Sequence, residues 1–100
     1  MRKSQLYTYI LSAIEDETDV SRDSIIANGK QPDIVDARAL LYHSLQSVCF
    51  YPSQIARITG HSRQRVTTLL NGFDARCRYH KMLSIFAQNI RKKLANISLF

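Results

Sequence analysis

The sequence predicts an all-α fold, and three observations support this. Apolar residues recur at three- and four-residue spacing along most of the chain, which is the period of an amphipathic helix. Only three glycines and two prolines interrupt the pattern. The length of 100 residues suits one helical core. We therefore expect a single compact domain over residues 1–100, with five or six helices and a short apolar tail at 95–100.

The first half of the chain predicts three helices. A first helix is expected from about Ser4 to Thr18. Ser21 resembles an N-cap, so a short helix should follow it, ending near residue 27. Residues 28–32 then form a loop. Asp33 is expected to cap a third helix that runs to about residue 48, with Arg38 near the edge of its core face, either in an ion pair or facing a phosphate.

The second half predicts two short helices and one long one. Pro52 suits the first turn of a helix, where its missing N–H costs nothing. A second helix should end near Asn71-Gly72, which is a good stop signal. A last helix is expected from about 75 to 94. Its apolar stripe would consist of Tyr79, Met82, Leu83, Phe86, Ile90 and Leu94.

The segment 52–73, PSQIARITGHSRQRVTTLLNGF, has the spacing of a helix-turn-helix. Ala56 is small where the second helix would cross the first, and Gly60 follows four residues later, where the turn needs a positive φ. Val66, six residues further on, would fill the space between the helices. Any αα-hairpin in a helical core could share this spacing. The Arg- and Gln-bearing start of the second helix favours DNA, because these side chains pair with guanine and adenine edges.

The residues expected to contact DNA fall into two groups. The exposed face of the second helix would read base edges, whereas other polar and basic side chains would hold the backbone. For any single surface Lys or Arg, plain solubility is the alternative explanation. The base-reading candidates are Ser62, Arg63, Gln64, Thr67 and Thr68. The backbone candidates are Lys30, Arg38, Ser53, Gln54, Arg57, Arg65, Arg76, Arg78 and Lys81.

The charge is distributed unevenly along the chain. Residues 1–56 hold five Lys/Arg and seven Asp/Glu, whereas residues 57–100 hold nine Lys/Arg and a single acid, Asp74. The positive half contains the helix-turn-helix candidate. Such a field attracts polyanions and predicts salt-dependent affinity for DNA.

Other kinds of chemistry find no support in the sequence. Cys49 and Cys77 are too few for a disulfide framework, and we expect them to be reduced and at least partly in the core. Cys77-x-x-His80 offers only two of the four ligands that a structural zinc needs. The chain contains no P-loop, nucleophile elbow or HExxH motif. We therefore expect neither an enzyme nor a cofactor, metal or small-molecule substrate. With no apolar run of 18 residues and no signal peptide, we expect a cytoplasmic, nucleoid-associated protein without a membrane partner.

Residues 33–42, DIVDARALLY, resemble a helix of the C-terminal origin-binding domain of the bacterial replication initiator DnaA. The order of helices is also similar, so the resemblance covers about residues 5–94. It implies a helix-turn-helix fold that binds double-stranded DNA in replication initiation. It also implies that the protein is bacterial or from a phage. In place of the family's Asp-His-Thr-Thr run this chain has Ser62, Arg63, Gln64 and Arg65, and the loop before residue 33 contains only Lys30 as a basic residue. The family's ATPase region has no counterpart here.

We therefore expect sequence-specific binding of double-stranded DNA, in replication initiation or its control. One alternative is a transcriptional regulator, with the apolar tail, ANISLF, as the surface through which a homodimer would form. Another is an adaptor that binds a replication protein through the acidic face of Glu15, Asp16, Glu17 and Asp19.

Overall fold

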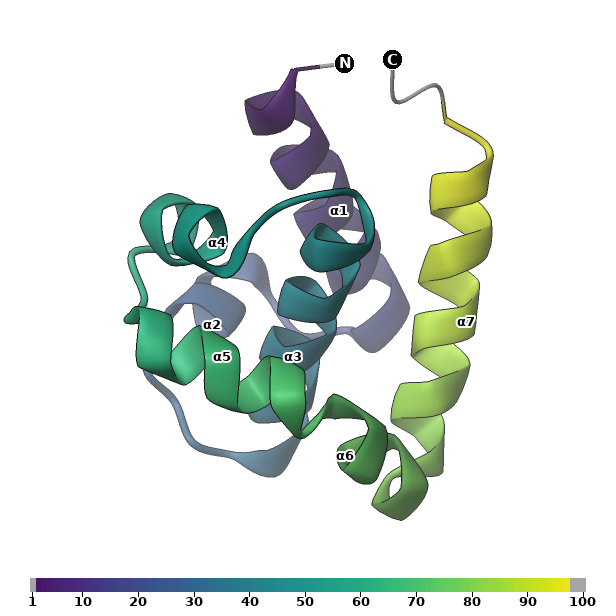
Figure 1. Ribbon diagram of the computed structural model, residues 1–100. Coiled ribbons are helices and arrows are strands. Elements are labelled where there is room, and N and C mark those ends of the chain that lie inside the picture. Colours follow the sequence, from purple (N-terminus) through teal and green to yellow (C-terminus); the bar gives the residue numbers. More distant parts are fainter. Residues whose placement is uncertain (1, 98–100) are drawn as a thin grey trace.

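A computed structural model describes residues 2–97, and the helices of that part of the chain surround one long central helix (Figure 1). The described residues contain no strand, so the all-α prediction is confirmed, with one or two helices more than expected. The helices are α1 (Lys3–Thr18), α2 (Arg22–Ile26), α3 (Pro32–Ser47), α4 (Pro52–Thr59), α5 (Arg63–Asn71), α6 (Phe73–Tyr79) and α7 (Lys81–Ala95).

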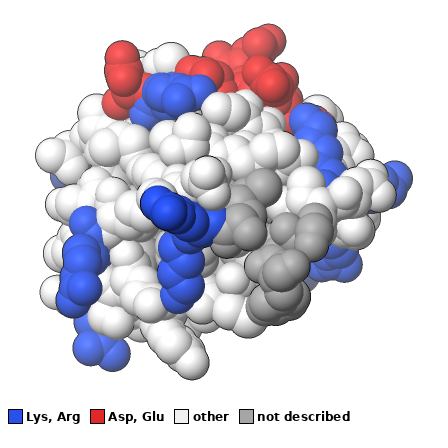
Figure 2. Space-filling model, turned by 90° about the horizontal axis from the view of Figure 1, so that it is seen from above, with Lys and Arg blue, Asp and Glu red and all other residues white. Residues whose placement is uncertain are grey.

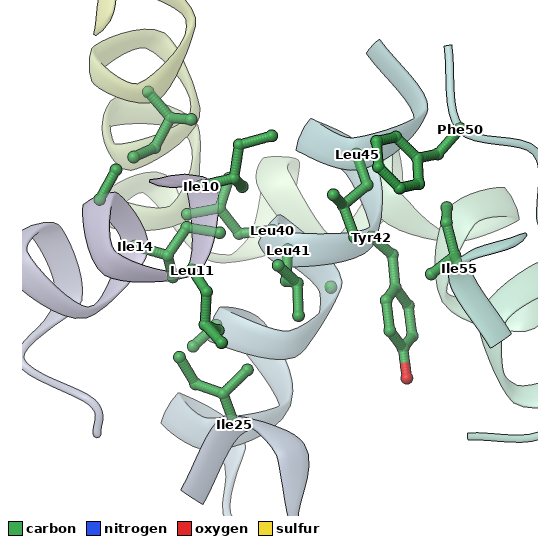
Figure 3. Close-up of a cluster of buried hydrophobic side chains, with 14 of the residues drawn as sticks. Ile10, Leu11, Ile14, Ile25, Leu40, Leu41, Tyr42, Leu45, Phe50 and Ile55 are labelled. Carbon is green, nitrogen blue, oxygen red and sulfur yellow. The ribbon is translucent and has the colours of Figure 1, made fainter. Parts of the chain in front are cut away.

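The central helix is α3, which contacts all six other helices. The sequence predicted one apolar stripe on it, but the helix is buried on nearly every side. Residues 37–42 are all buried, and so are Ser44 and Leu45. Figure 3 shows Leu40, Leu41 and Leu45 packed between the apolar side chains of α1, α2 and α4. The rest of the domain is therefore positioned by its contacts with α3.

The acidic end of α1 holds neighbouring helices in place. The Glu15 carboxylate accepts a hydrogen bond from the backbone N–H of Arg22, the first residue of α2, at 2.8 Å. Glu17 accepts one from Asn89 of α7 at 2.5 Å and pairs with Lys93 at 3.7 Å. Two of the four acids proposed as an adaptor surface therefore have partners within the domain, while Asp16 and Asp19 are exposed.

The start of α3 differs from the prediction. Asp33 was expected to cap this helix, but the helix already begins at Pro32, with Gln31 as its N-cap. The reason is that the proline ring fixes φ near the helical value and suits the first helical position. Asp33 thus lies within the first turn. Two further predicted starts are confirmed, because Ser21 caps α2 through the N–H of Ser24 and Pro52 is the first residue of α4.

The single long helix predicted over residues 75–94 is wrong. The chain breaks at His80, which has φ −121° and ψ 90°, between α6 and α7. Asp36 of α3 holds this corner by accepting from His80 Nδ1 at 2.8 Å and from Arg76 Nη1 at 3.0 Å. The break also changes the predicted stripe. Leu83, Ile90 and Leu94 are buried and Phe86 half-buried, but Tyr79 and Met82 are 85% and 56% exposed.

Three smaller expectations can also be compared with the structure. Cys49 is exposed, contrary to prediction, because it turns the chain after α3 with φ 73°. Cys77 is half-buried against the core. In the described part, no three His, Cys, Asp or Glu side chains gather as a metal site, and no helix is long and apolar enough to cross a membrane. Of the predicted apolar tail, residues 98–100 lie outside the described residues.

Candidate nucleic-acid interface

Two short helices, α4 and α5, pack against each other and against α3. Ile55 of α4 and Val66 of α5 are fully buried, as the spacing predicted. Gly60 adopts the left-handed conformation, with φ 76°, at the C-terminal end of α4. Ser62 then caps α5 by accepting a hydrogen bond from the Arg65 N–H at 3.1 Å. The positive φ expected at Gly60 is therefore confirmed.

His61 fixes this turn to the rest of the domain. Its side chain is buried between α2 and α3, where Nε2 lies 2.6 Å from the Ile26 carbonyl oxygen and Nδ1 contacts the Tyr42 hydroxyl. Because a carbonyl can only accept, Nε2 carries the proton, and Nδ1 accepts from Tyr42. The two rings also meet edge to face, with centroids 5.8 Å apart.

Burial determines the protonation of this pair. Burial lowers the pKa of His61, and the nearby Arg38 and Arg65 guanidiniums act in the same direction, although the bond to Ile26 opposes them. Burial also raises the pKa of Tyr42 to about 12. Both groups are thus neutral at physiological pH. A neutral imidazole can keep one nitrogen as an acceptor, which the Tyr42 hydroxyl requires.

The first turn of α5 presents its polar side chains to solvent. Ser62, Arg63 and Gln64 are exposed, and so is Thr68 one turn later, whereas Thr67 is half-buried. Ser62 already accepts the Arg65 N–H but retains its O–H as a donor. The structure therefore brings the predicted base-reading residues onto one helix, with Thr67 the least accessible of them.

Arg65 connects α5 to the loop between α2 and α3. Its Nη1 donates to the Asn28 side-chain oxygen at 2.7 Å, and the side chain is half-buried. Lys30, two residues further along the same loop, is exposed. The loop thus contacts α5 through a pair of residues that are 37 positions apart in sequence.

Arg38 is not available to a phosphate, and its prediction as a backbone contact is wrong. The residue is only 2% exposed. Its guanidinium donates to four main-chain carbonyl oxygens, at distances of 2.5 to 3.4 Å. These carbonyls close α2 and open the loop that follows, where the backbone has no helical partners of its own. The accepting residues are Ser24, Ile25, Ala27 and Gly29.

The remaining backbone candidates divide between two places. Ser53 and Arg57 are exposed on α4, while Gln54 uses its side-chain oxygen to accept the Tyr51 N–H at 2.8 Å. Arg78 and Lys81 are exposed at the corner between α6 and α7. Arg76, at the same corner, is paired with Asp36. Figure 1 shows this corner at the far end of α5 from the α4–α5 turn.

The helices α4 and α5 carry no acidic side chain. No carboxylate occurs between Gln54 and Phe73, so α4, the turn and all of α5 carry only basic and neutral side chains. Figure 2 shows one face of the molecule, on which acidic side chains gather at one edge beside some Lys and Arg, while the rest of that face carries basic side chains without acidic ones. A polyanion would approach α4 and α5 without meeting a carboxylate on either helix.

The buried joint of Arg38, Tyr42 and His61 was not foreseen from the sequence as a unit. Arg38 and Tyr42 lie one helical turn apart on α3, but His61 follows them by 23 and 19 residues, so no local spacing connects it with them. One signal was present: an Arg and a Tyr close to the apolar face of a helix need buried partners, because an unpaired buried charge is costly. Comparison of the chain with protein-family models, curated proteins and solved structures gives no match.

Proposed function

We propose that this protein binds double-stranded DNA in a sequence-specific manner, with α5 in the major groove and α4 across the backbone. One observation carries the proposal. The first turn of α5 exposes Arg63 and Gln64 beside a capped helix start, and the turn before it is fixed by the buried side chain of His61. Reading a base edge requires long polar side chains on a rigid, correctly started helix.

The exposed side chains match base chemistry. A guanidinium such as that of Arg63 can donate two parallel hydrogen bonds to guanine, and the Gln64 amide can both donate to and accept from adenine. Each such pair discriminates against a wrong base by about 1–3 kcal/mol. Thr68 and the free O–H of Ser62 offer further contacts nearby, and the half-buried Thr67 offers its methyl group at most.

Backbone binding would come from the surface around α5. Ser53 and Arg57 of α4, together with Lys30 in the adjacent loop, are exposed on the elements that flank α5. Arg65 can contribute only through the part of its guanidinium that Asn28 leaves free. Arg78 and Lys81 lie further away and would reach only flanking phosphates. These contacts would position α5 without specifying sequence.

The resemblance to the DnaA origin-binding domain supports a role in replication initiation or its control. Within the resembling segment 33–42, Asp36 bonds to α6 and Arg38 bonds to the end of α2 and the loop after it. The resemblance is therefore one of architecture, and the target site depends on the differing residues 62–65. A transcriptional regulator would bind DNA through the same surface, and only the place of its target site in the DNA would differ.

Fluorescence anisotropy tests the proposal directly. The protein is titrated against a duplex containing a DnaA box, a scrambled duplex and a random-library pool, each at low and near-physiological salt. Sequence-specific binding predicts a site, the box or one selected from the pool, with a Kd near 10 nM or below, about 1,000-fold tighter than for the scramble. Absence of binding at low salt would contradict DNA binding altogether.

A pair of double variants locates the interface. Arg63→Ala with Gln64→Ala should abolish discrimination between the selected site and its scramble. The matched control is Gln88→Ala with Arg91→Ala, which removes one exposed Gln and one exposed Arg from α7. Both variants lose the same charge, so a difference between them cannot come from net charge. Equal effects of the two variants would place the reading surface elsewhere.

A further inference from the structure

A groove of about 660 Å³ lies where the start of α3, the α1–α2 connection and the α6–α7 corner meet. Its apolar lining includes Val20, Ala37, Leu83 and Phe86, together with the exposed Met82. The corner that forms one side of the groove is held by the bonds of Asp36 to Arg76 and His80. The groove is therefore a feature of the packed fold, and the helix-turn-helix does not use it.

A protruding apolar side chain lies at the edge of this groove. Tyr79 is 85% exposed and lines both the groove and a second hollow of about 350 Å³ on the α6 side. Met82 and Ile85 follow it on α7, 56% and 46% exposed. Among the described residues, three of the five large exposed apolar side chains thus fall within seven residues. Such a cluster marks a surface that another molecule covers.

The groove also carries two opposite charges without partners. Asp33 of α3 and Lys81 of α7 both line it and are both exposed. Within the described part of the chain, neither comes within 4.0 Å of an opposite charge. The groove therefore presents an acid on one helix and a base on another, with apolar residues between them.

We propose that this surface binds a second copy of the same chain across a two-fold axis. In a two-fold interface, residue i of one copy meets residue j of the other and the reverse holds as well, so one patch must contain both halves of every contact. This patch does. Tyr79 of each copy would enter the groove of the other, and Asp33 of each would face Lys81 of the other.

The mixed charge favours a second copy over a partner of one sign. A strongly basic or strongly acidic partner would match one of the two charges and oppose the other, whereas a second copy matches both. The apolar content of the patch is also of the kind found at the centre of protein interfaces, where Tyr and Met are enriched. A chain that stays monomeric in the experiment below would exclude a second copy and leave the groove to a different protein.

Self-association does not depend on DNA binding, but it adds a consequence that rests on the proposed function. The α6–α7 corner lies at the far end of α5 from the first turn of that helix, called here the reading turn (Figure 1). A dimer formed at the corner therefore leaves the reading turns of both copies free. A two-fold dimer would relate the two copies of α5 by its symmetry axis. The preferred target would contain two inverted half-sites.

Sedimentation equilibrium without DNA tests the dimer. The wild-type chain, from about 1 µM to about 1 mM, should show a monomer–dimer equilibrium with a Kd inside that range, as expected for a modest interface. Tyr79→Ser should weaken the dimer at least about tenfold. The matched control is Tyr51→Ser, which removes a 70%-exposed Tyr outside the groove and should leave the equilibrium unchanged. A wild-type chain that stays monomeric, or a Tyr79→Ser variant that dimerises equally well, would overturn the proposal.

A charge exchange tests the reciprocal pairing. Asp33→Lys and Lys81→Asp should each weaken self-association, because each places like charges across the axis. Mixed together, these two variants should form a heterodimer, since both charge pairs are then opposite. Circular dichroism establishes that each variant is folded. A mixture no more dimeric than its components would contradict the proposed arrangement. Neither result depends on DNA, so the dimer and the DNA-binding function can fail separately.

Discussion

The two sides of the helix-turn-helix use similar side chains in opposite ways. On the inner side, Arg38 and His61 are buried and bonded to carbonyl oxygens of the α2 region. On the outer side, Arg63 and Gln64 are exposed, and their side chains make no hydrogen bond to the described residues. The inner polar groups therefore determine where α5 lies, and the outer ones are free to meet another molecule. The burial of a polar side chain therefore distinguishes a structural role from a binding role better than its position in the sequence does.

Replacement of the buried Arg38 is the strongest test of the structural role assigned to the inner side. Arg38→Met keeps the length and apolar contacts of the side chain but leaves four carbonyls without their donor. We expect a loss of about 3–5 kcal/mol in the free energy of unfolding, because buried acceptors lose charged hydrogen bonds. Urea denaturation followed by circular dichroism measures this.

Arg57→Met is the matched control for that loss. Arg57 is exposed on α4, so its replacement should change stability by less than about 0.5 kcal/mol. If both variants unfolded at the same urea concentration, Arg38 would not be the structural residue that its contacts indicate.

The case of Arg38 also shows what the sequence could and could not predict. Helical spacing located α1 to α5 within about two residues, because their caps and apolar stripes are local signals. The same spacing placed Arg38 at an edge, since it cannot show that six helices would surround α3. The carbonyls that bind Arg38 lie 9 to 14 residues earlier, outside the helix whose spacing was used to place it.

The sequence did not predict the break at His80, for a related reason. Residues 75–94 keep a helical apolar period through the break, so the sequence predicted one helix. The corner is determined by Asp36, more than 40 residues earlier, which no local window includes. Tyr79 and Met82 were assigned to the core because they match the period of the helix, and only the tertiary structure shows them on the surface. The candidate reading residues were easier to place, because they lie in one turn with a recognisable cap.

On the outer side, a conservative change should have a large effect. Arg63→Lys keeps the charge but removes the two-pronged donor, so it separates base reading from attraction to phosphate. We expect affinity for the selected DNA site to fall by about 1–3 kcal/mol, with nonspecific binding and its salt dependence unchanged. Anisotropy titrations of the selected and scrambled duplexes measure both quantities.

Arg57→Lys provides the comparison for that variant. A backbone contact tolerates the exchange, so this variant should bind the selected site nearly as well as the wild type. Loss of specificity in Arg57→Lys but not in Arg63→Lys would exchange the proposed roles of α4 and α5.

Ser62 lies on the boundary between the two sides, since it caps α5 and also faces solvent. Ser62→Ala should lower the free energy of unfolding by about 1 kcal/mol, whereas Ser62→Gly should cost only a few tenths, because glycine is an acceptable N-cap. Neither variant retains the hydroxyl. If the hydroxyl reads a base, both variants lose specificity equally in the anisotropy assay despite their different stabilities. If the loss of specificity were instead larger in Ser62→Ala than in Ser62→Gly, in proportion to stability, the only role of Ser62 would be to cap α5.

The smallest expected effect is a pH dependence that originates on the inner side. Burial lowers the pKa of His61, and also that of His43, which stacks on Phe73 with ring centroids 4.0 Å apart. Below the ordinary histidine pKa of 6.5, the unfolded chain therefore binds more protons than the folded one. Stability is then complete above pH 6.5 and falls as the pH drops below it, by less than about 1.4 kcal/mol per pH unit for each group.

Urea denaturation at pH 7.5, 6.5 and 5.5 should show this decline, and His61→Gln should make it shallower even though the variant starts from a lower stability. His43→Gln should remove a separate part of the slope without affecting the reading turn. If stability were constant down to pH 5.5, His61 would accept a proton in place, and the Tyr42 hydroxyl would not depend on a neutral imidazole.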